Sequence, residues 1–370
     1  MGRAQTCEVL PAPLRYGALR ETSQVCLRKI TCDDWWIMLA QTISKFPDVS
    51  DFNFRFFVGD DDFTLLCEVH NACNIADGLE EQVSVEEFKH EVEHLPNFHV
   101  PDDTLIVEHH DNVYGYVMVY YRPADDEGNW IHWLRLMLLP EAQVPEVEEA
   151  VLSWGENRLR EKCVAPMEAE RFFQTWCGEN MMRKKELLAD QGYAAIRYSY
   201  LMRRPNLDHI PESALPDGLE FRAVETDHLR ELWAVRCEAF RDHWGHTAET
   251  EDDFQRWISD PNVNISLWRA VWDKKTNRAI GLSVNAIFPN DNARYGFKRG
   301  WLFSIGVLRE WRKKGVASAV VVESLKALRE AGMTESVLGV DAENPSGALR
   351  LYERLGYERY QTFGIYRKEM

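Results

Sequence analysis

The sequence contains no apolar run that approaches the roughly 20 residues needed for a membrane-spanning helix. Its first twenty residues also lack the continuous apolar segment of a secretory signal. The eight cysteines include no C-x-x-C pair and are scattered through apolar stretches, which favours reduced, buried thiols. These absences predict a cytoplasmic protein with no membrane partner.

Positive charge is also scarce. The 370 residues include 43 lysines and arginines against 60 aspartates and glutamates, which gives a net charge of -17. Such a surface repels phosphate backbones and argues against nucleic acid as a partner. The length of the chain suggests about two domains, and its 45% hydrophobic content is ordinary for packed domains.

The two halves of the chain resemble each other at a recurring offset, which indicates an internal repeat. Near the ends of the two copies the offset is 164, as between Gly192 and Gly356. Elsewhere the matched positions are 166 residues apart: Val69 and Val235, Phe88 and Phe254, and Gly115 and Gly281. A duplicated module explains these matches better than chance.

Each copy has the same pattern of helices, an apolar hairpin, a long apolar strand, an amphipathic helix and a terminal hairpin. This mixture predicts an α/β or α+β fold, with a mixed sheet flanked by helices in each copy. A segment with three prolines fits an interdomain linker. The predicted division is an N-terminal extension (1–52), a first module (53–204), a linker (205–216) and a second module (217–370). The extension includes an amphipathic helix around Asp33 to Lys45.

A basic turn in the second module has the pattern of an anion site. An apolar run of strand length, 300–308, is followed by Arg312-Lys313-Lys314-Gly315 and then by an amphipathic helix. The first backbone N–H groups of a helix have no partner within it, and a glycine lets an anion approach them closely. The three cations add charge that a diphosphate would compensate. Taken alone, the same pattern also fits a basic surface turn at the start of a helix.

Two motifs together resemble the GNAT superfamily of N-acetyltransferases, and more closely its tandem-domain members such as mycothiol synthase. The first motif is Arg312-x-x-Gly315-x-Ala317, between a strand and a helix. The second runs from Asn344 through a short helix with Tyr352 to Gly356-Tyr357. The resemblance covers about 217–370 well, and about 53–204 only in outline.

The resemblance implies acetyl-CoA as co-substrate and a sheet whose fourth and fifth strands splay apart around the pantetheine arm. Backbone groups of 305–307 would bond the arm like an added strand. Asn344 would contact the pantetheine amides, although it could equally only shape its turn. The cofactor-binding residues implied are Ile305, Gly306, Val307, Arg312, Lys313, Lys314, Gly315, Val316, Ala317, Ser318 and Asn344.

Catalytic roles are assigned on the same resemblance. Tyr352 stands at the family position of the acid that protonates the coenzyme sulfur, although it could also be a core residue. No carboxylate lies between Gly300 and Leu308, where many relatives carry a base. We therefore expect a water relay that touches Ser304, or a group from the segment 238–247. His243 lies in that segment and has a suitable intrinsic pKa, although a solvated loop histidine is an equal alternative.

The first copy lacks the anion motif. Gln143, Val144, Pro145 and Glu146 stand where the basic turn stands in the second copy. The cations are gone, the proline removes a backbone donor, and an acid replaces the glycine. We expect this copy to bind no coenzyme and to have a structural role.

The segment His90-Glu91-Val92-Glu93-His94 matches the H-E-x-x-H pattern of zinc proteases. The equivalent helix of the second copy carries Arg256 and Asp260 instead of the two histidines. The helix therefore needs no metal, and we expect a solvated helix face and no metal site.

These patterns predict an N-acetyltransferase that acetylates a primary amine of a small molecule or peptide in the second module. A non-catalytic coenzyme-binding or protein-interaction module is the alternative, favoured by the missing strand carboxylate. No residue selects the acceptor, although the resemblance keeps thiol-sugar amines among the candidates.

Overall fold

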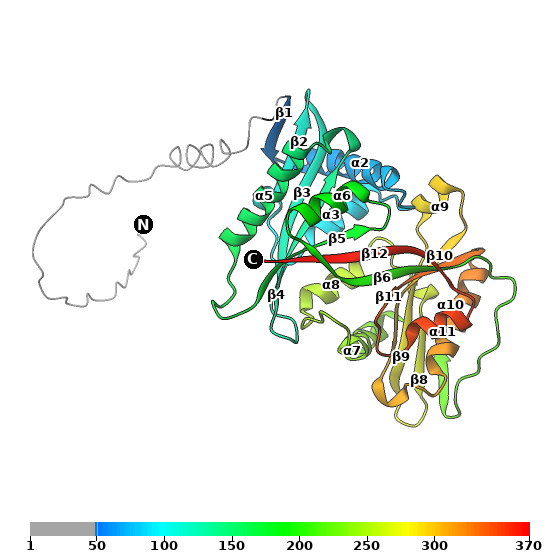
Figure 1. Cartoon of the computed structure of the whole chain (residues 1–370). Coiled ribbons are helices and arrows are strands. Elements are labelled where there is room, and N and C mark those ends of the chain that lie inside the picture. Colours follow the sequence, from blue (N-terminus) through cyan, green and yellow to red (C-terminus); the bar gives the residue numbers. More distant parts are fainter. Residues whose placement is uncertain (1–48, 50) are drawn as a thin grey trace, which may run out of the picture. The chain divides into compact units, whose positions relative to one another are not determined.

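A computed structural model describes residue 49 and residues 51–370. The chain divides into Met1–Pro47 and Asp48–Met370, and the fold presented below belongs to the second unit (Figure 1). The helix expected around Asp33 to Lys45, and with it most of the extension 1–52, lies outside the described residues. None of the helices within the described residues combines the length and apolarity needed to cross a membrane.

One mixed sheet of twelve strands runs through both sequence repeats, in the order β1-β2-β3-β4-β5-β12-β6-β11-β10-β9-β8-β7. Its strands are β1 (Phe52–Phe56), β2 (Thr104–His109), β3 (Asn112–Arg122), β4 (Trp130–Leu138), β5 (Arg171–Gly178), β6 (Ala194–Arg204), β7 (Leu219–Arg222), β8 (Arg269–Asp273), β9 (Arg278–Ala286), β10 (Arg299–Val307), β11 (Glu335–Asp341) and β12 (Glu358–Glu369). The predicted class, a mixed sheet flanked by helices, is confirmed.

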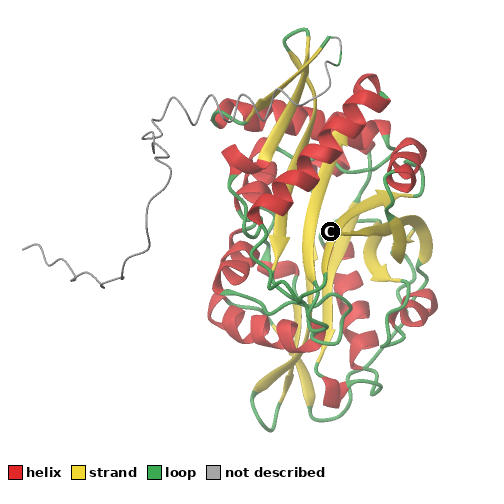
Figure 2. Ribbon diagram, turned by 60° about the vertical axis from the view of Figure 1, so that its left-hand side comes forward, coloured by secondary structure: helices red, strands yellow, loops and turns green. Residues whose placement is uncertain are grey.

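Helices cover both faces of the sheet (Figure 2). The α-helices are α2 (Asp60–Ala76), α3 (Val85–Glu93), α4 (Val100–Asp103), α5 (Pro145–Lys162), α6 (Met182–Asp190), α7 (Leu229–Phe240), α8 (Glu251–Ser259), α9 (Pro289–Tyr295), α10 (Val316–Glu330) and α11 (Ala348–Arg354). Helices α3 and α8 begin with matching capping boxes, on Ser84 with Glu87 and on Thr250 with Asp253. The two repeats therefore also share the type of N-terminal cap on this helix.

The last strand of each repeat lies between strands of the other repeat. Strand β6 of the first repeat pairs with β11 of the second, and β12 of the second pairs with β5 of the first. The two exchanged strands pair with each other at the centre of the sheet (Figure 1). The two repeats therefore share one continuous hydrogen-bonded sheet.

Each repeat contains one parallel strand pair that diverges after four residue pairs. Strand β4 pairs with β5 from Trp130 to Trp133, and β10 pairs with β11 from Arg299 to Leu302. A bulge in β10 at Phe303 shifts its register against β9 at this point. The remaining half of β10 thus keeps β9 on one side and has no strand on the other.

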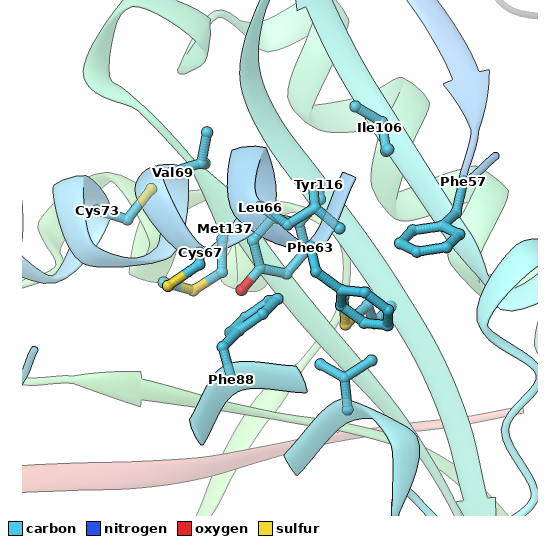
Figure 3. Packing of buried hydrophobic residues seen from close by; sticks show 12 residues of the cluster. Phe57, Phe63, Leu66, Cys67, Val69, Cys73, Phe88, Ile106, Tyr116 and Met137 are labelled. Atoms are coloured by element: carbon cyan, nitrogen blue, oxygen red, sulfur yellow. The ribbon is translucent and has the colours of Figure 1, made fainter. Parts of the chain in front are cut away.

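Separate apolar clusters fill the space between helices and sheet. In the first repeat, α2 and α3 bury Leu66 and Phe88 against Tyr116 of β3 (Figure 3). The rings of Phe88 and Tyr116 meet edge to face with centroids 6.1 Å apart. In the second repeat, α10 and α11 bury Leu325 and Tyr352 together with Leu302 of β10. The candidate site of the second module lies at the edge of this second cluster.

Candidate functional site

The start of α10 is open and has no side-chain cap. Gly315 is the N-cap residue, and its φ of 86° lies in the left-handed region that favours glycine. A Cβ built on Gly315 would meet nothing within 4 Å. The N–H groups of 316–318 begin the helix and so lack helical partners. The geometry at this point is that of an anion site.

The three cations of the turn have different surroundings. The Arg312 guanidinium donates to the carbonyl oxygens of Val307 (3.1 Å) and Ala239 (2.9 Å), and it pairs with Asp242 at 2.9 Å. It thereby ties the turn to the end of β10 and to α7. Lys313 and Lys314 are exposed, and within the described chain neither forms an ion pair. The Lys314 ammonium lies over the Trp311 ring, 4.8 Å from its centroid. Free charge at the turn therefore comes from the two lysines.

The diverging half of β10 forms one wall of the cleft beside this turn. Ile305, Gly306 and Val307 pair with 281–283 of β9, whereas β11 has already left β10 after Leu302. At Gly306 an added Cβ would lie 2.9 Å from the Ala239 side chain. Helix α7 therefore approaches the strand closely, and a larger residue would push it away. This half-strand has one edge on which an extended ligand could pair.

Asn344 lies in the turn before α11. Its Oδ1 accepts hydrogen bonds from the backbone N–H (2.9 Å) and the hydroxyl (2.6 Å) of Ser346. The side chain thus shapes the turn. Its Nδ2 donor has no partner among the described residues, so the contact with a pantetheine amide stays a prediction.

Tyr352 is 6% exposed and packs in the cluster that contains Leu302 and Leu338, the last paired residues before the strands diverge. Its hydroxyl forms no hydrogen bond with any described residue. The hydroxyl is not completely buried, so it keeps some contact with solvent. Burial raises the pKa of the Tyr352 phenol, which keeps it protonated at neutral pH. Tyr352 is thus a core residue near the divergence of the strands, and its role as an acid stays a prediction.

The other two predicted catalytic groups are not joined to Tyr352 or to each other by a hydrogen bond within the described chain. Ser304 is half-buried on β10, and its hydroxyl has no partner there. His243 lies in the turn after α7 and packs on Phe240 with ring centroids 4.5 Å apart. Burial lowers the pKa of the His243 imidazole, so it is neutral at pH 7. Their catalytic roles stay predictions.

A cavity of about 260 Å³ lies next to the point where β10 and β11 diverge. Leu302 packs toward α10, so its neighbour Trp301 points to the other face of the sheet, where the cavity lies. Trp301 and Val337, which pair in register, both line it. Its remaining walls include residues of both repeats: Leu79, Glu80, Glu81, Trp176, Ser199, Leu201, Arg299, Tyr360, Gln361, Phe363 and Ile365.

Charged groups gather on one wall of this cavity. Arg299 is 2% exposed, and its guanidinium pairs with Glu335 (2.6 Å) and Glu80 (2.8 Å). The third nitrogen of Arg299, Nη2, is buried without a partner. Neither this wall nor Glu81 was identified from the sequence. Glu80 and Glu81 belong to the first repeat, and no sequence motif links their segment to strand β10, which carries Arg299.

The corresponding cleft of the first repeat keeps a cavity of about 270 Å³, but side chains of the protein bond the strand edge that borders it. The Gln143 amide donates to the carbonyl of Leu138 (2.9 Å), and the Lys184 ammonium donates to that of Leu136 (3.4 Å). Both acceptors lie at the diverging end of β4, where an added strand would pair. These contacts use two carbonyl groups that an added strand would need, whereas the absence of coenzyme binding, expected from the lost motif, stays a prediction.

The H-E-x-x-H histidines have partners within the protein. His90 Nε2 lies 3.0 Å from the Ser259 hydroxyl, and His94 Nδ1 lies 2.7 Å from the His90 carbonyl oxygen. Among the described residues, one other group has metal-ligating atoms within 4.8 Å of one another: Glu225, Asp227 and His228. These carboxylates are exposed, and the cluster caps a short helix. Neither group has the features of a built metal site.

Comparison with known proteins assigns the class. Residues 229–357 match the acetyltransferase (GNAT) family, so the second repeat contains a GNAT acetyltransferase domain. The fold agrees with a GCN5-related N-acetyltransferase from Sphaerobacter thermophilus (TM-score 0.66, 24% identity, 88% of this chain and 97% of that one). A tandem GNAT protein of the clavulanic acid pathway also matches (TM-score 0.62, 13% identity, 86% and 98%).

Several curated relatives are mycothiol acetyltransferases. The mycothiol acetyltransferase of Arthrobacter sp. (strain FB24) is 27% identical over 219 residues, which cover 58% of this chain and 67% of that protein. The mycothiol acetyltransferase of Thermomonospora curvata is 29% identical over 211 residues, 56% and 65% of the two chains. The matched part of this chain thus spans about two thirds of these relatives.

Proposed function

We propose that the protein transfers the acetyl group of acetyl-CoA to a primary amine of a small molecule or peptide, at a site in the second repeat. One observation carries the proposal: the uncapped start of α10 at Gly315 opens beside a strand edge that has no strand partner. The helix start suits a diphosphate, and the strand edge suits an extended amide-bearing arm. The relatives that are named mycothiol acetyltransferases support a small-molecule acceptor.

The residues of this site have separate tasks. Backbone donors of 316–318, with Lys313 and Lys314, hold the diphosphate, and the edge of β10 aligns the arm so that its end lies near Leu302. Acetyl-CoA supplies an activated thioester. Tyr352 then donates a proton to the departing sulfur, since its hydroxyl is protonated and has no other partner. Ser304 and His243 border the same cleft and could pass a proton by way of water.

A test of this proposal compares acetyl transfer by the wild type with that of Tyr352→Phe on a panel of amines. The panel contains glucosamine, spermidine and a peptide with a free N-terminus. We expect wild-type turnover on at least one amine, and about a 100-fold lower kcat for the variant, which is in the range for one general acid. Coenzyme affinity should stay unchanged, because the ring is retained. Equal kcat values would refute the assigned role of Tyr352.

The second candidate is a coenzyme-binding module without catalysis. It is favoured by the strand β10, which carries no carboxylate between Gly300 and Leu308. The same amine panel separates the two functions. Coenzyme binding without transfer to any amine, over the whole pH range, would favour the module.

A further inference from the structure

We infer that the cavity lined by Trp301 and Val337 is the acceptor site, and that Glu81 of the first repeat is the general base that deprotonates the amine. This inference rests on the proposed function. It assigns to the catalytically silent repeat a group that the strand β10 lacks.

The first argument is position. Trp301 and Val337 form the pair just before Leu302 and Leu338, after which β10 and β11 separate. A ligand arm that follows the open edge of β10 from Val307 toward Phe303 therefore ends beside this cavity. The cavity lies on the face away from α10, so an acceptor enters from the side opposite the diphosphate. The two substrates then meet without competing for space.

The second argument is the chemistry of the walls. Trp301, Trp176, Tyr360 and Phe363 supply flat apolar surfaces. Trp301 stacks on Phe303, with centroids 5.4 Å apart and planes at 14°, which extends this surface toward the open edge. Phe303 is 51% exposed, although it is a large apolar side chain. Such surfaces suit a ring or a short carbon skeleton.

The third argument is that Glu81 is available. Glu80 is held by Arg299, whereas the Glu81 carboxylate has no hydrogen bond or ion pair within the described chain. Glu81 also lines the cavity. Its carboxylate is therefore free to bind an ammonium there.

The electrostatic environment agrees with this role. The surrounding protein, together with the charges of Glu91 and Asp291, raises the pKa of Glu81 to about 7. Glu87 adds to the negative charge around it, and Arg135 opposes the shift. The side chain itself is exposed, so its desolvation is partial and the charges of Glu91 and Asp291 are the firmer cause of the shift. A carboxylate with a pKa near neutrality is suited to accept a proton from an ammonium at pH 7 to 8.

The reaction balances as follows. Glu81 takes one proton from the ammonium, which leaves a neutral amine. The nitrogen attacks the thioester carbonyl carbon, the C–N bond forms, and the C–S bond breaks as the thiolate takes the proton of Tyr352. The amide nitrogen releases its extra proton to water, Tyr352 regains a proton from solvent, and Glu81 releases its proton to solvent. The expected acceptor is a compact primary amine whose ring or short carbon skeleton fits the aromatic walls of the cavity.

The test uses the full chain with Glu81→Gln and, as a matched control, Glu86→Gln, which removes an exposed charge from the nearby helix α3. The kcat/KM for the best amine of the panel is measured between pH 5.5 and 9.5. We expect an ascending limb near pH 7 in the wild type and the control. Glu81→Gln should lose this limb and be at least about 100-fold slower at pH 7.5. An unchanged limb and rate in Glu81→Gln would overturn the inference.

A binding measurement keeps the inference separate from the proposed function. Glucosamine is titrated calorimetrically into each protein saturated with CoA at pH 8. We expect weaker binding in Glu81→Gln by about fivefold or more, and wild-type binding in the control. CoA affinity should be equal in all three proteins. If no amine is acetylated by the wild type, the proposed function fails, whereas equal glucosamine affinity in all three proteins refutes the acceptor site.

Discussion

At the scale of the residue, the basic side chains of the turn differ in their contacts: Arg312 bonds to the protein, whereas Lys313 and Lys314 form no ion pair within the described chain. Arg312 belongs to the family motif, and its guanidinium contacts Val307, Ala239 and Asp242. In this protein it cross-links the turn to the end of α7. The lysines beside it have no such contacts. The sequence alone treats the three cations as equivalent, because Ala239 and Asp242, the partners that distinguish Arg312, lie about 70 positions earlier in the chain.

Replacement of Arg312 by alanine should therefore lower stability first. Two backbone carbonyls would lose their donor, which costs about 1–3 kcal/mol in the free energy of unfolding. Denaturant unfolding measures the loss. Arg350→Ala, at an exposed arginine with no hydrogen bond or ion pair within the described chain, is the control and should change stability by less than about 0.5 kcal/mol. Equal stability of the two variants would contradict the cross-link.

At the scale of the element, local signals in the sequence were sufficient for the strand, turn and helix of the site. Apolar 300–308, the basic turn and the amphipathic helix that follows appear in the structure as β10, the turn and α10. The divergence of β10 from β11 agrees with the resemblance. The bulge at Phe303 was not predictable, because it depends on the register with β9 rather than on local composition. The cavity beside it was not predictable either, because its lining comes from five strands and from the loop 79–81, which are distant from one another in the sequence.

At the scale of the whole molecule, the recurring offset predicted two similar modules but not how they join. Strands β6 and β12 have sequences that fit a sheet in either repeat, so nothing local decides the partner. The structure places each in the sheet of the other repeat. The first repeat thus completes the sheet of the second, and its loop 79–81 reaches the cavity at the divergence of the strands.

Separation of the repeats tests this arrangement. A chain of residues 217–370 lacks β6, so the edge of β11 between Ser336 and Asp341 has no partner. Unpaired edges aggregate. We expect this chain to be insoluble or unfolded alone, and to be recovered as a complex when 49–216 is produced in the same cells. A stable, folded monomer of 217–370 would contradict the importance of the exchange.

The most direct test of the central claim is the calorimetric affinity for CoA of three full-length proteins: the wild type, Gly315→Glu and Glu146→Ala. At Gly315 a side chain is strained by the left-handed backbone, and a carboxylate would lie where the diphosphate binds. At Glu146 of the first repeat the residue is exposed, away from the α10 site. The account predicts at least about tenfold weaker binding for Gly315→Glu, and wild-type affinity for Glu146→Ala. An equal loss in both variants, or none in Gly315→Glu, would contradict a single coenzyme site at the start of α10.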